Sequence, residues 1–233
     1  MLTMSTYMKD THMTLQIHGS ALSPFTRKVT LLAMELGMDF ASNELIPYTA
    51  PKAFNEMSPL RKTPVLEDGD FTLNDSSAIC AYLQMIAPPT PYLIPEDPKD
   101  AARILWIEEY ADTAVFDVVS KGFFQPLMVN RLLGKPIDMD RVARAIKEEL
   151  PPCFDYLESY LSEDEWFCGS EFTLADISIY AQMANLKHTQ HLPKPSLYPN
   201  LMNHFEKMMD RETVAKLFQT EVTYLQNMQA KYA

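Results

Sequence analysis

The amino-acid sequence predicts a small α/β domain followed by an all-helical domain. Between Thr14 and about Ile86, short apolar runs of strand character alternate with stripes of helical period. A proline-rich stretch at residues 87–98 follows, and proline resists helix formation and lacks a backbone donor. Beyond it only helical spacing recurs. We therefore expect a flexible tail over residues 1–12, an α/β domain over 13–87, a linker over 88–99 and a helical domain over 100–233.

The first domain is predicted to have the order βαβ, a connecting helix or loop, and then ββα. Leu15 and Ile17 indicate a strand that ends at Gly19. A second strand is expected over residues 40–46, and a hairpin turns at Asp68-Gly69, which is a typical turn pair. Two apolar stripes with helical spacing complete the pattern, the first stopping at Gly37: Phe25, Val29, Leu32 and Leu36; then Ala78, Ile79, Tyr82, Leu83 and Ile86.

The second domain carries helical stripes over residues 104–118 and 142–161. Pro151-Pro152 should break or kink the second of these, because proline removes an intrahelical hydrogen bond. Thr173 and Asp176 have the spacing of a capping box, flanked by the two positions of a hydrophobic staple. We interpret this motif as a device for folding rather than catalysis.

Composition and charge narrow the possible partners. The chain has 20 basic and 31 acidic residues, a net charge of −11, which disfavours nucleic acid and anionic membrane surfaces. No apolar run approaches the roughly 20 residues of a membrane span, and the N-terminus lacks a secretory signal. Three widely spaced cysteines indicate free thiols in a reducing compartment. His188 and His191 lack a third ligand, so packing roles are favoured over a metal.

Ser23 begins the first candidate site. The segment Ser23-Pro24-Phe25-Thr26-Arg27-Lys28-Val29 follows a predicted strand directly and opens a helix. Serine is a preferred N-cap and proline is preferred at the first helical position, so local capping alone explains the pair. Alternatively, the Ser23 hydroxyl is the catalytic group, placed at the N-terminus of this helix.

Two further segments carry similar alternatives. Lys62-Thr63-Pro64-Val65 places proline at the start of a strand, where it is tolerated without any function. A cis Thr63-Pro64 bond would instead turn the Thr63 backbone toward a peptide-like ligand. Asp75 and Ser76 open the next helix, whose N-terminus suits a carboxylate, while Asp75 suits an ammonium. An α-amino acid presents both charges, although simple capping also explains this pair.

Taken in order, these segments resemble the cytosolic glutathione transferases. The resemblance rests on S-P-F-T-R-K-V, K-T-P-V, D-S-S-A-I and F-T-L-A-D-I, with Tyr198-Pro199-Asn200-Leu201 similar to the segment that opens a late helix of the family. It covers residues 13 to about 218. It implies the glutathione transferase fold, with a thioredoxin-like N-terminal domain and an all-α C-terminal domain. It also implies a cytoplasmic homodimer of the serine type, as in the bacterial theta, zeta and beta classes.

The resemblance assigns roles residue by residue. Ser23 matches the residue that faces the glutathione sulfur. Thr63, which precedes the family's cis-proline at Pro64, would pair through its backbone with the cysteinyl unit. Asp75 and Ser76 match the acidic-Ser pair that holds the γ-glutamyl end. Lys62 would reach the glycine carboxylate.

Three departures from the family pattern bear on these roles. Arg61 stands where the family often has glycine, which adds charge and bulk beside Lys62. Asp75 replaces the commoner glutamate and is one methylene shorter. Ser23 and Thr26 occupy the slots of a Cys-Pro-x-Cys redox motif, so dithiol chemistry is not possible there.

The implied reaction joins glutathione, as co-substrate and without a metal, to a small hydrophobic electrophile. We expect Ser23 to donate a hydrogen bond to the thiolate; Ser20, Thr26 or a backbone amide are the alternatives. The electrophile pocket is expected between the domains, with four candidate liners: Leu22, Tyr110, Ala114 and Phe124.

Other activities remain open at this point. Glutathione could also remove halide or peroxide oxygen from the substrate. A non-catalytic binding or regulatory relative and a glutathione-dependent isomerase are rival functions, and the Ser-Ser-Cys-Ser motif of the zeta-class isomerases is absent.

Overall fold

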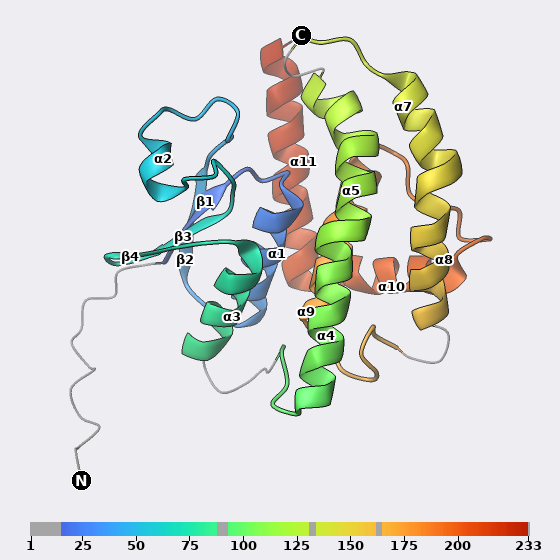
Figure 1. Ribbon diagram of the computed structural model, residues 1–233, viewed down its shortest axis with the longest axis horizontal. Helices are drawn as coiled ribbons and strands as arrows, with labels where there is room; N and C mark the ends of the chain where they lie inside the picture. Colours follow the sequence, from blue (N-terminus) through green and yellow to red (C-terminus); the bar gives the residue numbers. More distant parts are fainter. Residues whose placement is uncertain (1–14, 88–92, 131–133, 162–164, 233) are drawn as a thin grey trace.

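A computed structural model describes residues 15–87, 93–130, 134–161 and 165–232, so the predicted tail over residues 1–12 lies outside the described residues. Two units stand side by side (Figure 1): a sheet with its helices, and a bundle of helices. The first unit runs in the order β1 (Leu15–Gly19), α1 (Pro24–Glu35), β2 (Phe40–Glu44), α2 (Phe54–Met57), β3 (Val65–Asp68), β4 (Phe71–Asn74) and α3 (Ser76–Ile86).

The four strands form one mixed sheet in the order β2-β1-β3-β4. β1 runs parallel to β2, and β3 runs antiparallel to both β1 and β4. Helices α1 and α3 cover the face of the sheet that is turned toward the bundle. This is the thioredoxin-like arrangement that the sequence predicted, and the hairpin turns at Asp68-Gly69 as expected.

The second unit is entirely helical among its described residues. Between α4 and α8 the chain passes repeatedly from α-helical to π-helical hydrogen bonding, and Pro126 lies inside one π segment. Its elements are α4 (Pro98–Tyr110), η1 (Ala111–Val115), α5 (Phe116–Val119), η2 (Ser120–Val129), α7 (Met139–Arg144), η3 (Ala145–Glu149), α8 (Leu150–Tyr160), α9 (Leu174–His188), α10 (Pro199–Met209) and α11 (Glu212–Tyr232).

Two boundaries differ from the sequence prediction. Helix α4 begins at Pro98, inside the predicted linker, because Asp97 caps it by accepting from the amides of Lys99 and Asp100. Pro151 and Pro152 do not separate two helices. They lie in the first turn of α8, directly after the π-helical segment η3, so the interruption is a change in hydrogen bonding rather than a loop.

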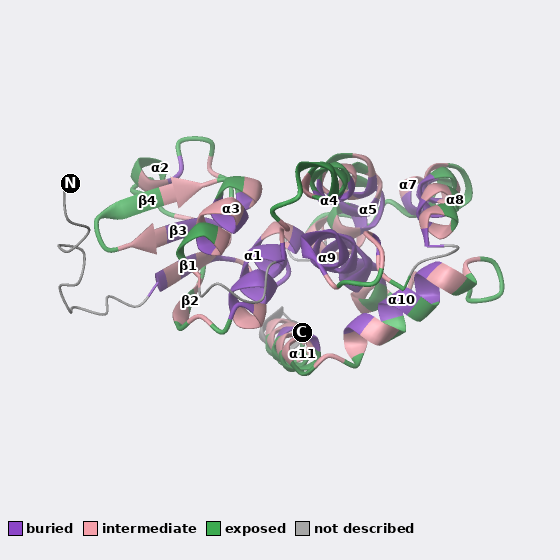
Figure 2. Ribbon diagram, turned by 90° about the horizontal axis from the view of Figure 1, so that it is seen from below, coloured by how far each residue is buried: buried purple, intermediate pink, exposed green. Residues whose placement is uncertain are grey.

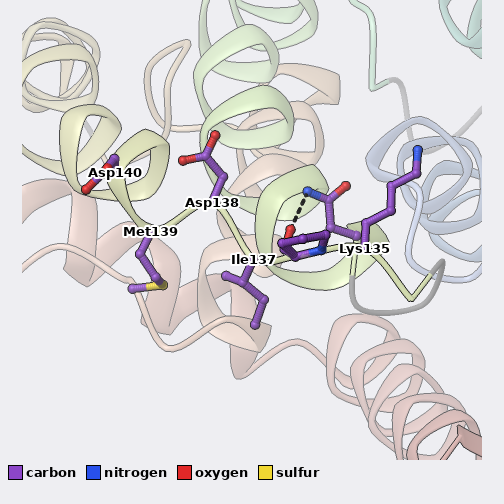
Figure 3. Close-up of a pocket in the computed structure, with 7 residues that line it drawn as sticks. Lys135, Ile137, Asp138, Met139 and Asp140 are labelled. Atoms are coloured by element: carbon purple, nitrogen blue, oxygen red, sulfur yellow. Dashed lines mark hydrogen bonds between the residues drawn. The ribbon is translucent and has the colours of Figure 1, made fainter.

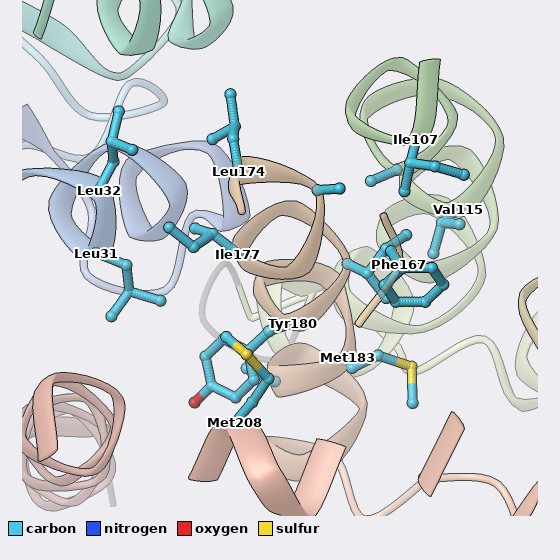
Figure 4. Close-up of a cluster of buried hydrophobic side chains, with 14 of the residues drawn as sticks. Leu31, Leu32, Ile107, Val115, Phe167, Leu174, Ile177, Tyr180, Met183 and Met208 are labelled. Carbon is cyan, nitrogen blue, oxygen red and sulfur yellow. The ribbon is translucent and has the colours of Figure 1, made fainter. Parts of the chain in front are cut away.

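Helix α9 forms the centre of the molecule. All but two of its residues, Lys187 and His188, are buried, and it packs against α1, α4 and α10 (Figure 2). Leu174 and Ile177 point from it toward Leu31 and Leu32 of α1, in the core shared with the first unit, and Tyr180 lies beside Met208 of α10 (Figure 4). A helix that is buried on all sides is the core of a bundle rather than a surface element.

The predicted capping box starts this central helix. The Asp176 carboxylate accepts from the backbone amide of Thr173 at 2.8 Å and also from the amide of Phe167 at 2.9 Å. His204 of α10 reaches the same carboxylate at 3.0 Å. The motif therefore joins α9 to its neighbours, in agreement with a folding role. In the described part of the chain, no helix is both long and apolar enough to cross a membrane.

Candidate functional site

One end of each of three strands, β1, β3 and β4, lies at the same edge of the sheet. His18, near the end of β1, pairs with Val65 at the start of β3, and Val65 pairs with Asn74 at the end of β4. The residues that follow β1, precede β3 and follow β4 therefore share this edge. They are Ser23, Thr63 and Pro64, and Asp75 and Ser76, so the register gathers the predicted glutathione-binding residues in one place.

Ser23 is the N-cap of α1 and is half-buried. Its Oγ accepts from the amide of Thr26 at 3.4 Å, a long hydrogen bond. Its own amide donates to the carbonyl of Ser20 at 3.0 Å. Just before this turn, the backbone of Gly19 approaches Thr26 so closely that a Cβ on Gly19 would lie 2.3 Å from Thr26 Oγ1. Gly19 thereby lets α1 start immediately above the end of β1.

Thr63 and Pro64 lead into β3 through a cis peptide bond, as the resemblance implied. Pro64 is buried and Thr63 is half-buried. Lys62, the predicted ligand of a carboxylate, is exposed. Its backbone is fixed by Ser58, whose Oγ accepts from the Lys62 amide at 3.0 Å and donates to the Lys62 carbonyl at 2.9 Å.

Asp75 has a left-handed backbone conformation, with φ at +76°, and caps α3. Its Oδ1 accepts from the amides of Ser77 and Ala78 at 3.0 and 3.1 Å. Asp75 is exposed, whereas Ser76 is buried in the first turn. A carboxylate and a helix N-terminus thus stand together, which suits the two charges of an α-amino acid.

A buried cation links this turn to the helical bundle. The Lys28 ammonium of α1 donates to Ser77 Oγ at 3.3 Å, to Glu108 Oε1 at 2.7 Å and to Asp112 Oδ2. Burial opposes the charge on Lys28, but Cys80, Asp112 and Glu108 raise its pKa overall. Burial also raises the pKa of Asp112 to about 6 and that of Cys80 to about 12.

The sequence analysis did not find this cluster, although Lys28 carries a signal for it. Lys28 and Leu32 are four residues apart and therefore lie on the same face of α1, the apolar one. A lysine on an apolar helix face needs a buried partner. Glu108 and Asp112, four residues apart on the facing helix, supply two.

The four candidate liners of the electrophile pocket differ in how much surface they offer to a ligand. Leu22 is 6% exposed and so offers little surface to a ligand. The Tyr110 ring lies 4.7 Å from that of Tyr156 on α8, which turns it toward the interior of the bundle. Ala114 and Phe124 are half-buried.

The sequence analysis missed an aromatic pair that joins the two domains. The ring centroids of Phe25 on α1 and Phe116 on α5 are 4.6 Å apart. Phe25 lies in the first turn of α1, which Ser23 caps, so this pair joins that turn to the helical domain. Phe25 and Phe116 are 91 positions apart in the sequence and meet only because the two domains pack together.

Two open hollows lie away from this site. One, of about 590 Å³, is bordered by Asn130 and by residues 135–140, between η2 and α7 (Figure 3). The other, of about 490 Å³, lies where α1 and β2 face α11. Neither is lined by a residue of the predicted site.

The two histidines that could suggest a metal have packing roles. His188 contacts the carboxylate of Glu221 at 2.6 Å and stacks on Phe218 with ring centroids 4.5 Å apart. The same carboxylate pairs with the buried Arg27 of α1 at 2.6 Å. His191 lies against the ring of Phe123. Across the residues with described side chains, no three His, Cys, Asp or Glu groups assemble as metal ligands.

Comparison with known proteins identifies the family to which this geometry belongs. Residues 22–85 match the N-terminal domain of glutathione S-transferases, and residues 128–221 match their C-terminal domain. A glutathione S-transferase of Hyoscyamus muticus is 31% identical over 173 residues, which cover 71% of this chain and 79% of that protein. The chain belongs to the glutathione S-transferase family. The sequence resemblance is thereby confirmed at the level of the family.

Other glutathione transferase relatives cover similar lengths. Mouse glutathione S-transferase theta-3 is 30% identical over 171 residues, covering 71% of this chain and 70% of its own. A glutathione S-transferase of Methylobacillus flagellatus, solved with glutathione bound, superposes with a TM-score of 0.74 at 26% identity, covering 88% of this chain and 98% of that one. One from Rhodospirillum rubrum superposes at 0.81 with 20% identity, covering 87% and 91%, and supports the fold alone.

Proposed function

We propose that this glutathione transferase activates the glutathione thiolate with the hydroxyl of Ser23 and directs it at a small hydrophobic electrophile. The observation that carries the proposal is the meeting of Ser23, Thr63 and Asp75 at one edge of the sheet. A tripeptide along this edge would meet the start of α1, the backbone before β3 and the start of α3 in turn.

Each part of glutathione has a partner in this arrangement. The γ-glutamyl carboxylate would accept hydrogen bonds from the start of α3 at Ser76. Both capping bonds of Asp75 end on Oδ1, so Oδ2 can accept from the γ-glutamyl ammonium. The backbone of Thr63 would pair with the cysteinyl unit, and Lys62 would attract the glycyl carboxylate.

Ser23 is sufficient to favour the thiolate. A free thiol has a pKa of about 8.5, and lowering it by two units needs about 2.7 kcal/mol. A hydroxyl hydrogen bond to an anion contributes roughly 1.5–3 kcal/mol, and a helix N-terminus about 0.3–1 kcal/mol. The long bond from Thr26 to Ser23 Oγ uses only an oxygen lone pair, so the hydroxyl proton can point at the sulfur.

The reaction forms one bond between the glutathione sulfur and an electrophilic carbon. The thiolate supplies the electron pair of the new bond, and the thiol proton passes to solvent. The electron pair of the bond that breaks at the substrate carbon moves onto a leaving group or an acceptor atom of the substrate. Apolar surface at Phe25 and Phe116 would receive the body of the electrophile. Transfer to 1-chloro-2,4-dinitrobenzene is a suitable first assay.

We further propose that the protein is a cytoplasmic homodimer. Large apolar side chains remain exposed on β4, α3 and α4, among them Phe71, Met85 and Trp106. A second copy of the chain would remove them from water. Light scattering should then give twice the chain mass of 26.6 kDa.

Calorimetric titration with glutathione, followed by assays with a panel of electrophiles, tests the function. Ser23→Ala should lower the turnover number about ten- to a hundredfold, while the Kd of glutathione changes less than about threefold. Ser20→Ala is the companion variant that distinguishes the two hydroxyls, since Ser20 lies in the same turn but outside the helix. An unaffected turnover in Ser23→Ala would move the role to Ser20, Thr26 or a backbone amide.

The rival functions predict different results. A non-catalytic binding protein would bind glutathione or another ligand and turn over none of the electrophiles. A glutathione-dependent isomerase would require catalytic amounts of glutathione and release it unchanged. Stoichiometric consumption of glutathione thiol would support the transferase and contradict both.

A further inference from the structure

Arg61 has an unusual backbone conformation next to the proposed glycine end of the site. Its φ is +50°, in the left-handed region that favours glycine. Its amide donates to the carbonyl of Ser58 at 2.8 Å, which closes a tight turn before Lys62. This conformation is energetically unfavourable for arginine, so the contacts that its side chain makes should account for its presence here.

The Arg61 guanidinium is held by oxygen atoms of the preceding loop. Nη1 donates to Asn55 Oδ1 at 2.6 Å and, less closely, to the Pro51 carbonyl at 3.5 Å. Nη2 donates to the carbonyls of Ala50 at 2.7 Å and Pro47 at 3.0 Å. The two Nη atoms carry four hydrogens, and four acceptors face them. Both Nη groups are therefore occupied by protein acceptors and are not placed to bind a ligand carboxylate.

These bonds close a segment of sixteen residues, 47–62, which we call the α2 segment because it contains α2. The guanidinium carbon of Arg61 lies 5.8 Å from the ring of Phe54, which is buried. The segment is also bound to the sheet, because the side-chain amide of Asn74 on β4 donates to the backbone carbonyl of Met57 at 2.7 Å. Arg61 thus joins the start of the α2 segment to its end.

We infer that Arg61 is a positioning residue that determines specificity for the glycyl end of glutathione. This inference rests on the proposed function. Arg61 holds the α2 segment closed before the ligand arrives, so Lys62 projects from a fixed turn. Preformed geometry lowers the entropy lost on binding. The protein should therefore discriminate glutathione from γ-glutamylcysteine, which lacks the glycine, and this discrimination should depend on Arg61.

Arg61→Gly tests the inference, because glycine accepts the left-handed backbone and removes only the side chain. Arg61→Lys is its companion: it keeps a cation but cannot span several acceptors as the guanidinium fork does. In both variants the Kd of glutathione should rise roughly tenfold, the effect of losing one or two charged hydrogen bonds. The Kd of γ-glutamylcysteine should change less than about twofold, and the turnover number at saturating glutathione should be preserved.

Hydrogen–deuterium exchange supplies a readout that is independent of ligands. In Arg61→Gly, amides of residues 47–62 should exchange faster, and those of α9 should not change. Equal weakening of glutathione and γ-glutamylcysteine, or unchanged exchange in residues 47–62, would overturn the inference. If the native chain bound neither peptide, the proposed function would fail instead, and the exchange data would still report on the role of Arg61 in the loop.

Discussion

The ammonium of Lys28 on α1 lies 2.7 Å from a carboxylate oxygen of Glu108 on α4, and both side chains are almost fully buried. Asp112 approaches the same ammonium, so two carboxylates share one cation between the domains. Because Lys28 also reaches Ser77, the contact between domains adjoins the turn proposed to bind the γ-glutamyl end.

Stability should depend on pH through Asp112. Its pKa is raised from 3.8 in an unperturbed chain to about 6 in the folded protein. Its contribution is therefore fully present below pH 3.8 and is lost as the pH rises through 6. Compared with Asp112→Asn, which stays neutral, the native protein should lose about 2–3 kcal/mol of unfolding free energy between pH 4 and 7. Urea titrations at several pH values measure this difference, and a constant difference would contradict it.

Removing the cation should be more harmful than removing the whole cluster. Lys28→Met leaves Glu108 and Asp112 buried without their partner and should lower the free energy of unfolding by about 3–5 kcal/mol. The triple variant Lys28→Met/Glu108→Gln/Asp112→Asn removes all three charges and should recover most of this loss. Equal losses in the single and triple variants would contradict this prediction, because removal of the unpaired carboxylate charges would then recover no stability.

The cap and the proposed ligand contact of Asp75 can be separated. Asp75→Asn keeps an oxygen for the amides of Ser77 and Ala78, and asparagine tolerates a positive φ. Its free energy of unfolding should change by less than about 1 kcal/mol, while the Kd of glutathione rises about tenfold because the charge facing the ammonium is lost. Asp75→Ala should weaken both. Normal glutathione binding by Asp75→Asn would place the ammonium elsewhere.

The sequence predicted most of what depends on neighbours along the chain. Ser23 before Pro24, Thr173 before Asp176 and the Asp68-Gly69 turn are local signals, and each helix or hairpin begins or turns where they indicate. The order of strands and helices in the first unit could be predicted from such signals because turns and caps mark the ends of its strands.

The relationships that depend on distant residues were not predictable in this way. Lys28 meets Glu108 and Asp112 across 80 and 84 positions, and Phe25 meets Phe116 only once the two domains pack. Arg61 looked like added bulk beside Lys62, yet its side chain turns back onto its own loop. A single sequence records the type of each side chain but not the direction in which it leaves the backbone.

The bond between Arg27 and Glu221 spans 194 positions, from the first helix to the last. On a translating ribosome, the first domain emerges before Glu221 has been synthesised, so this ion pair cannot yet form. A nascent chain truncated before Glu221 would leave the buried Arg27 guanidinium with the Ala181 carbonyl of α9 as an acceptor but without its carboxylate partner. The middle of α11 therefore completes this contact between the two domains, and a chain that ends before Glu221 should unfold at a lower urea concentration than one that ends after it.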